Sequence, residues 1–242
     1  IGFEAFAGCV SLKRVWVAKS GITGGENGKF VLPAGVQIIG PYAFRQCNAL
    51  QSICIPSSVS VLPSGLFIRC EQLTTVELHS AITEIGQHAF ADCSKLSNIQ
   101  MPESLTTIGA WAFTGCLSLT DANIVFGNKL QMIDDRAFEK CTGIRNVRLP
   151  ESVISVHRIA FDGCTLDTVY VTSKIEFGSG YQCWGANVNE ITLTKGFTGK
   201  LPRAKTVNIM STEVPEGSPH VIDTIPSNVL VINFAGTKEA WD

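Results

Sequence analysis

The chain has 242 residues, 45% of them hydrophobic, and carries 19 basic and 21 acidic side chains for a formal net charge of −2. This balance gives no electrostatic footprint for nucleic acid. The sequence has neither a basic run suited to a membrane surface nor an apolar run near the roughly 18 residues of a membrane span. We therefore expect no nucleic-acid partner and no membrane insertion within this chain, and enough apolar content for a sizeable core.

The chain starts at Ile1-Gly2-Phe3, already inside a repeat and without an initiator methionine or a signal peptide. It stops at Trp241-Asp242 without an obvious tail. We interpret it as a fragment of a longer protein, so that targeting signals need not lie within it.

An Ala-Phe pair recurs along the chain at a nearly fixed spacing. Its phenylalanines are Phe6, Phe44, Phe67, Phe90, Phe113, Phe138 and Phe161, and most intervals are 23 residues. A fixed period of about 20–50 residues is the signature of a stacked repeat architecture. We predict a single elongated domain over residues 1–242, with regular repeats over 1–172 and irregular, capping rungs over 173–242.

Each repeat contains a short stretch of alternating apolar residues. A period of two is typical of a strand that turns one face to the core. The pairs are Val15/Val17, Ile53/Ile55, Val76/Leu78, Ile99/Met101, Ala122/Ile124, Val147/Leu149, Val169/Val171, Ile191/Leu193, Val207/Ile209 and a weaker one at Leu230 to Ile232. We expect about ten rungs in one parallel sheet.

The other repeat positions predict the rest of each coil. Proline at 56, 102 and 150 lacks an N–H, so it ends ladder pairing and turns the chain. A second short extended piece then ends at Ile39, Leu62, Ile85, Ile108, Ile133 or Val156. Glycine at 40, 86 and 109 suits a sharp turn with positive φ. In Ala-Phe-x-x-Cys the Phe and Cys are three residues apart, which places them on one face of a helical turn. The expected fold class is therefore α/β.

Seven of the nine cysteines occupy one repeat position: Cys9, Cys47, Cys70, Cys93, Cys116, Cys141 and Cys164. The spacing of stacked strands, about 4.8 Å, is compatible with disulfides. Their side chains would point in parallel, however, and seven equivalent residues cannot all pair within one chain. We expect a column of buried thiols, and the redox compartment stays open. Cys54 should point outward, where it is reactive, bonded to another molecule or, as we favour, partly shielded.

Three segments break the period. Residues 20–29 form a glycine-rich insertion, in which Thr23 and Phe30 stand where a phosphate-binding loop needs glycine and Ser or Thr. We therefore expect a surface loop there. A two-residue insertion follows near Gly127, and a shortened coil lies between Leu193 and Ile209.

The consensus x-I-G-x-x-A-F-x-x-C-x-x-L-x-x-I-x-[IL]-P resembles the 23-residue leucine-rich repeat of the BspA-like family. Five units match between Ile39 and Pro150, and residues 233–241 resemble the closing segment of such arrays. Cys183-Trp184 departs from the pattern, because Ala-Phe is expected there. The resemblance implies a right-handed, curved solenoid with the sheet on its concave face and short helical turns on its convex side. It also implies a surface-exposed or secreted protein associated with adhesion, and no catalytic motif.

The residues between the core positions of each strand should point outward on the concave face, which solenoids use for binding. The candidate ligand-binding residues are Trp16, Glu77, His79, Gln100, Asn123, Arg148, Tyr170 and Thr192. Trp, Tyr and Arg are enriched in binding hot spots. Trp16, Arg148 and Tyr170 are therefore the first candidates, against the simpler interpretation of a solvated sheet face.

An enzyme is not indicated. The four histidines, at 79, 88, 157 and 220, match no H-E-x-x-H pattern, and no G-x-S-x-G occurs. Glu77 and His79 lie on one face, but such exposed pairs are usually only solvated. The column of thiols has no C-x-x-C spacing for zinc. We predict no catalytic residue, no metal site and no cofactor.

Our leading hypothesis is a non-enzymatic recognition or adhesion module, extracellular or on a cell surface, that binds a protein partner such as a host matrix protein. One alternative is a spacer that holds another domain away from the cell surface. The other is a carbohydrate-binding module with Trp16 and Tyr170 stacked on sugar rings, although these residues lie about six rungs apart.

Overall fold

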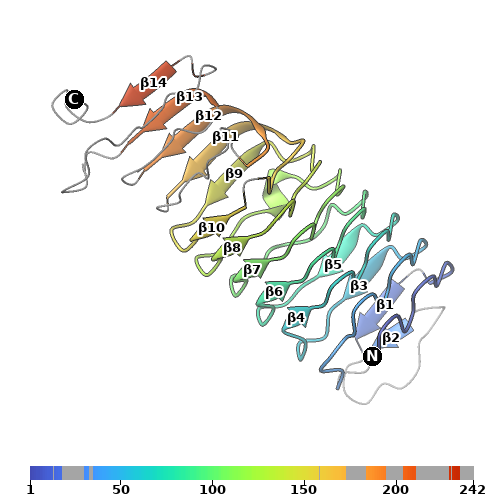
Figure 1. Ribbon diagram of the computed structural model, residues 1–242. Coiled ribbons are helices and arrows are strands. Elements are labelled where there is room, and N and C mark those ends of the chain that lie inside the picture. The colour runs from blue at the N-terminus through green and yellow to red at the C-terminus, as the bar shows by residue number, and fades with distance from the viewer. Residues whose placement is uncertain are drawn as a thin grey trace.

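The computed structural model describes residues 1–12, 14–17, 30–32, 35–157, 159–172, 184–194, 204–210, 229 and 231–234. It is a parallel β-solenoid of about six turns, in which the coils stack along one axis (Figure 1). The glycine-rich insertion, Cys183 and His220 lie outside the described residues, as does much of the predicted capping region. The division into regular and capping rungs stays a prediction.

One side of the solenoid, the long-strand face, carries two parallel sheets. The N-terminal sheet has the order β2-β1-β3-β5 and contains β1 (Arg14–Val17), β2 (Phe30–Leu32), β3 (Ser52–Cys54) and β5 (Thr75–Glu77). The C-terminal sheet has the order β14-β13-β12-β11-β9 and contains β9 (Asn146–Leu149), β11 (Thr165–Val171), β12 (Asn187–Leu193), β13 (Ala204–Ile209) and β14 (Val231–Phe234).

A second side, the short-strand face, carries the predicted second extended pieces. These are β4 (Val61–Leu62), β6 (Glu84–Ile85), β7 (Thr107–Ile108), β8 (Met132–Ile133) and β10 (Ser155–Val156), in the order β10-β8-β7-β6-β4. Figure 1 shows this sheet running unbroken past the middle of the array. Its core residues, such as Ile85 and Ile108, are buried.

The prediction of one continuous sheet was wrong at the centre of the long-strand face. Between β5 and β9 the only described pairing is an isolated bridge of Thr75 with Asn98. In the next coil, Asp121–Asn123 form a 3-10 helix, η1, instead of a strand. There Asn123 is buried and Ala122 is exposed, the opposite of the prediction for these two residues, whereas Ile124 is buried as predicted.

The predicted helical turns were also wrong. The Ala-Phe-x-x-Cys segments are turns in which the Phe N–H bonds to the next coil: Phe67 N donates to Ala89 O at 2.7 Å, and Phe90 N to Ala112 O at 2.8 Å. In a helix these donors would bond within their own segment. Left-handed residues such as Arg69, with φ of 60°, make this possible. Among the described residues only η1 is helical, so the structure supports a β-solenoid of about six turns and not an α/β array of ten rungs.

We call the side formed by these turns the turn face, and two of the glycines beside it have a different role from the one predicted. Gly86 and Gly109 are not among the described residues with positive φ. A Cβ on Gly86 would lie 2.6 Å from Leu62 O of the preceding coil. Close approach between coils, and not a left-handed turn, therefore requires glycine at these positions.

The core contains a continuous column of phenylalanines, as predicted. Successive rings from Phe6 to Phe161 stack with centroids 5.1–5.6 Å apart. Trp184 continues the column where Ala-Phe is missing, tilted by 49° to Phe161. Burial of one such ring contributes about 1.5–3 kcal/mol, so the column is a major source of stability.

The cysteines form the predicted second column. Each buried thiol donates to the carbonyl of the phenylalanine one coil earlier, as in Cys93 Sγ to Phe67 O at 3.1 Å. All of the described cysteines are free. Burial raises the pKa of Cys164 to about 12, and Cys116 and Cys141 are raised by the same cause. These thiols are packing residues with little thiolate at neutral pH.

Candidate functional site

The structure brings three of the predicted site residues together in the C-terminal sheet. Parallel register places Arg148 of β9 beside Tyr170 of β11, and Tyr170 beside Thr192 of β12. Asn208 of β13 follows Thr192 in the same row. We call these four residues the Arg148 row.

The members of the Arg148 row contact one another. The guanidinium carbon of Arg148 lies 4.5 Å from the centroid of the Tyr170 ring. Asn208 Nδ2 donates to Thr192 Oγ1 at 3.3 Å, and Asn233 Nδ2 donates to Asn208 Oδ1 at 2.8 Å. An exposed cation–π contact contributes about 0.5–1 kcal/mol. This is enough to orient Arg148 while leaving it in solvent.

The remaining candidates do not join this row. Trp16 lies in β1, but its side chain is outside the described residues. Glu77 and Gln100 are exposed at separate coils towards the N-terminus. His79 is half-buried, and its Nδ1 accepts from Ala81 N at 3.2 Å, so the local turn, and not Glu77, occupies that nitrogen.

Asn123 is the one candidate whose predicted orientation the structure contradicts. It is 3% exposed, and its Nδ2 donates to Ser97 O and Ile99 O at 3.1 and 3.0 Å. Its Oδ1 accepts from Thr120 N at 2.9 Å. Because η1 replaces a strand in this coil, the side chain turns inward and satisfies backbone groups that a strand would have paired.

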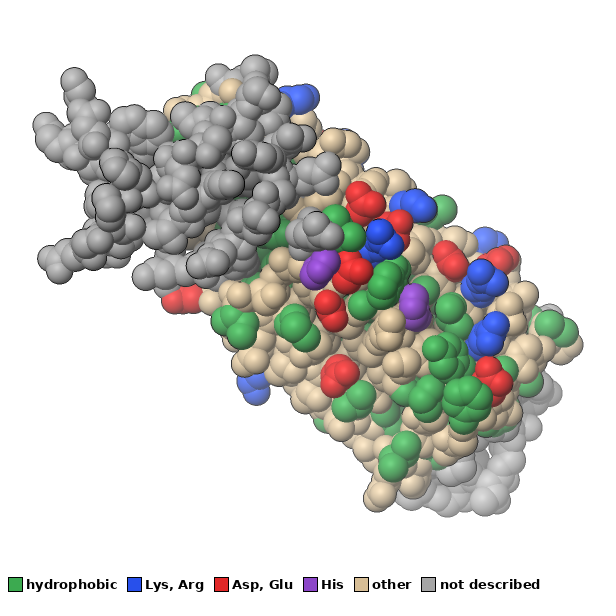
Figure 2. All heavy atoms as spheres, viewed as in Figure 1, with side chains coloured by type: hydrophobic (Ala, Val, Ile, Leu, Met, Phe, Trp, Pro, Cys, Tyr) green, Lys and Arg blue, Asp and Glu red, His purple; other side chains and the backbone are tan. Residues whose placement is uncertain are grey.

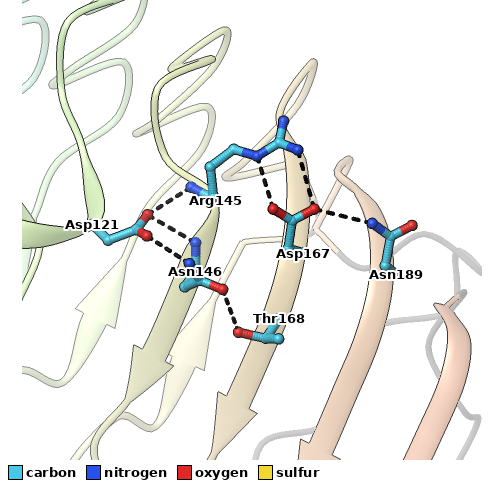
Figure 3. A network of polar contacts seen from close by, with 6 residues as sticks. All are labelled: Asp121, Arg145, Asn146, Asp167, Thr168 and Asn189. Atoms are coloured by element: carbon cyan, nitrogen blue, oxygen red, sulfur yellow. Dashed lines mark hydrogen bonds and ion pairs between the residues drawn. The ribbon is translucent and has the colours of Figure 1, made fainter.

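Beside the row, a polar network links η1 to three strands (Figure 3). Asp121 Oδ1 accepts the backbone N–H groups of Arg145 and Asn146 at 2.6 and 2.8 Å. Asn146 Oδ1 in turn accepts from Thr168 Oγ1 at 2.6 Å. Arg145 contacts Asp167 through Nε and Nη2 at 3.0 and 3.1 Å. Neither η1 nor this network was predicted from the sequence, because Asp121 and Asn123 fit the outward positions of an alternating strand.

The environment of Asp121 favours its charged form. Burial raises the pKa of this carboxyl, but hydrogen bonds from Asn146 and Arg145, together with the charge of Arg145, lower it further than burial raises it. The net effect is a pKa below the ordinary value. The carboxylate is therefore a permanent acceptor at neutral pH.

A family model described as BspA type leucine rich repeat region (6 copies) matches residues 23–127 and 122–216. The chain belongs to the BspA-type leucine-rich repeat family. The family consists generally of non-catalytic repeat proteins. No match was found among curated proteins.

Several solved structures resemble this BspA-type protein. A leucine-rich repeat protein of T. pallidum is 29% identical over 59% of this chain and 72% of its own, with a TM-score of 0.48. A leucine-rich cell surface protein of Faecalibacterium prausnitzii is 21% identical over 100% and 78%, with a TM-score of 0.40. The pneumococcal vaccine antigen PcpA is 14% identical over 84% and 67%, with a TM-score of 0.44.

The turn face of this BspA-type array carries a row of rings that the sequence analysis did not single out. His88 stacks on Trp111 with centroids 5.1 Å apart, and Arg136 covers the same indole at 5.8 Å. Phe3 meets Tyr42 edge-on at 5.8 Å. Each of these residues except Phe3 stands two positions before a core Phe. This shared repeat position is the sequence signal from which the row could have been predicted. In Figure 2 hydrophobic side chains gather towards the N-terminal end of the viewed face, with histidine and charged side chains near its middle.

The turn face also has a shallow hollow of about 370 Å³, lined by Arg69, Glu71, Asp92, Ser94, Gly115, Leu117 and Lys140. Arg69 Nε lies 3.7 Å from Asp92 Oδ2, and both side chains are more than half exposed. Such surface pairs contribute little to stability. The lining has two basic and two acidic side chains, so the formal charges of the hollow balance.

Cys54 is half-buried on β3, as the favoured interpretation predicted. Burial, with the nearby charge of Glu77, raises the pKa of its thiol, which lowers its reactivity. No group of three or more His, Cys, Asp or Glu side chains placed to hold a metal occurs within the part of the chain that the structure describes. In that same part, no helix has the length and apolar character needed to cross a membrane.

Proposed function

We propose that this protein is a non-enzymatic recognition module, secreted or on a cell surface, that binds a protein partner through its long-strand face. The observation that carries the proposal is the Arg148–Tyr170 pair on β9 and β11, in which Arg148 is exposed, Tyr170 is half-buried, and the guanidinium carbon lies 4.5 Å from the ring centroid. Arg and Tyr are the side chains most enriched in binding hot spots. The proposed location follows what membership of the BspA-type family implies.

The size of the face supports a protein partner. Five strands about 4.8 Å apart, with the longest about 20 Å long, give a patch on the order of 400 Å². A stable interface buries about 800 Å² on each partner. The C-terminal sheet therefore provides about half of such an interface, and the N-terminal sheet with Trp16 is the natural extension.

The test is binding of the purified protein to immobilised fibronectin, fibrinogen and a glycan panel, at low and physiological salt. We expect saturable protein binding that survives physiological salt and is lost in the Arg148→Ala/Tyr170→Ala double variant. Lys129→Ala, a change at an exposed cation elsewhere, is the control and should bind normally. Adding Trp16→Ala then measures the contribution of the N-terminal sheet.

Unchanged protein binding by the Trp16→Ala/Arg148→Ala/Tyr170→Ala variant would exclude this face as the binding surface. Binding to glycans alone would favour the carbohydrate alternative. No binding across the panel would favour the spacer.

A further inference from the structure

The carboxylates of the C-terminal sheet and its η1 border are already engaged by this chain. Asp121 accepts from Arg145 and Asn146. Asp167 accepts hydrogen bonds from Nε and Nη2 of Arg145 and from Nδ2 of Asn189 (Figure 3). Glu190 accepts from Asn208 Nδ2. Asp121 and Asp167 thus have the charge of Arg145 beside them, and Glu190 is engaged by an uncharged amide.

The positive charges are not matched in the same way. Arg145 is held by Asp167, but Arg148 and Lys205 are exposed, and no described carboxylate lies within ion-pair distance of either. The interaction that the structure describes for the Arg148 guanidinium is with the Tyr170 ring. Desolvating this surface against a partner would therefore leave uncompensated positive charge unless the partner supplies an anion.

The geometry of Arg148 favours one kind of anion. Its planar guanidinium has five N–H donors in a fixed fork that matches a carboxylate with two parallel hydrogen bonds. A guanidinium that stacks on an aromatic ring uses its face for that contact and keeps its N–H edges available for an anion. Thr192 continues the row beside Tyr170 with a half-buried hydroxyl. The amide of Asn208 is engaged within the fold by Thr192, Glu190 and Asn233.

We propose that Arg148 binds an Asp or Glu carboxylate of a protein partner, with Tyr170 holding the guanidinium in place and Thr192 contacting the segment that carries the acid. This inference rests on the proposed function and names the chemistry of the partner at its central contact.

The experiment is selection of a random linear peptide library on the immobilised full chain, followed by synthesis of the enriched peptides. Each acidic peptide is paired with its analogue in which Glu or Asp is changed to Gln or Asn. Affinities are then measured for the wild type, Arg148→Lys, Arg148→Gln, Tyr170→Phe and Tyr170→Ala, with Lys129→Gln as the matched loss of one charge at another site. A heparin-derived sulfated oligosaccharide is titrated in parallel.

We expect enriched peptides to carry a carboxylate. The amide analogue and Arg148→Gln should each bind at least about tenfold more weakly. Arg148→Lys should bind more weakly than wild type because it lacks the fork, and Tyr170→Phe should bind better than Tyr170→Ala because it keeps the ring. Lys129→Gln should bind like the wild type, and affinity should fall with rising salt.

Enriched peptides that bind equally well as amide analogues, but depend on Tyr170, would overturn this inference while leaving the face as the binding surface. Peptides that ignore both Arg148 and Tyr170 would overturn this inference and count against the proposed function. Equal weakening by Lys129→Gln would show general charge attraction and overturn the assigned contact. Oligosaccharide binding through Arg148 in place of peptide binding would overturn a protein carboxylate as the occupant.

Discussion

The carboxylate of Asp121 holds Asn146 with both of its oxygens: Oδ1 accepts the backbone N–H at 2.8 Å, and Oδ2 accepts Nδ2 at 2.6 Å. In an unbroken rung a backbone carbonyl has this role, as where Gln51 O accepts from Thr74 N and Thr75 N. Asp121 therefore replaces a missing carbonyl on one side of the break in the long-strand face.

Asn123 performs the complementary task on the other side, because its amide replaces missing backbone donors to Ser97 O and Ile99 O. Two side chains of one short 3-10 helix thus join coils that the sheet no longer joins. The short-strand face continues across the same coils through β7 and β8.

Asp121→Ala should destabilise the fold by about 1–3 kcal/mol, because it leaves the Arg145 and Asn146 N–H groups without their charged acceptor. Asp121→Asn keeps one acceptor oxygen, so its free energy of unfolding should decrease less than that of Asp121→Ala. Urea unfolding measures both. The control is Asp92→Ala, which removes a surface ion pair and should cost no more than about 1 kcal/mol. Equal losses for Asp121→Ala and Asp92→Ala would contradict the bridging role.

The stability of the wild type should fall in acid partly through Asp121. Its folded pKa lies below the ordinary value, so this carboxylate stabilises the fold above the unfolded pKa of about 3.9. That contribution is lost as the pH falls through the lower, folded pKa. The difference in unfolding free energy between wild type and Asp121→Asn should be constant near neutrality and shrink below about pH 4. If this difference in unfolding free energy grew in acid, the lowered pKa of Asp121 in the folded protein would be contradicted.

Asn123→Asp tests the donor role of the buried amide. The change is nearly isosteric, but it points carboxylate oxygens at Ser97 O and Ile99 O, where two donors are needed. We expect a loss of at least about 2 kcal/mol, since a buried charge would lose its partners, and a melting temperature that partly recovers when acid protonates the new carboxyl. Gln100→Glu, at an exposed neighbouring position, should have almost no effect. Similar melting temperatures for the two variants would contradict the inward orientation of the Asn123 amide and its donor role.

Gly65→Ala should be destabilising for two separable reasons. Gly65 has φ of +63°, and an added Cβ would lie 2.2 Å from the Tyr42 ring. The left-handed conformation alone costs about 1–2 kcal/mol for a residue with a side chain. Adding Tyr42→Ala should relieve the clash but not this backbone cost, so the two changes should be non-additive in thermal unfolding. The control is Gly35→Ala, where no atom lies within 4 Å of the added Cβ. A loss of stability there as large as for Gly65→Ala would contradict this explanation.

The sequence by itself determined the columns of the core. Apolar residues repeated at a fixed period have to face one interior, so the sequence alone assigns Phe90, Cys93 and Ile85 to the core. The same periodicity located the Arg148 row, since alternation places Arg148, Tyr170 and Thr192 opposite the core.

Only the tertiary structure decided how each coil bonds to the next. Spacing of three residues is shared by a helical turn and by a stack of left-handed turns, and the contact of Phe67 N with Ala89 O selects the second. Asp121 and Asn123 fit the outward positions of a strand pattern, and their use as substitutes for backbone groups depends on where the adjacent coils place Asn146 and Ser97. Hydrogen bonds between coils join residues about 23 positions apart in the chain, and no local pattern specifies their direction.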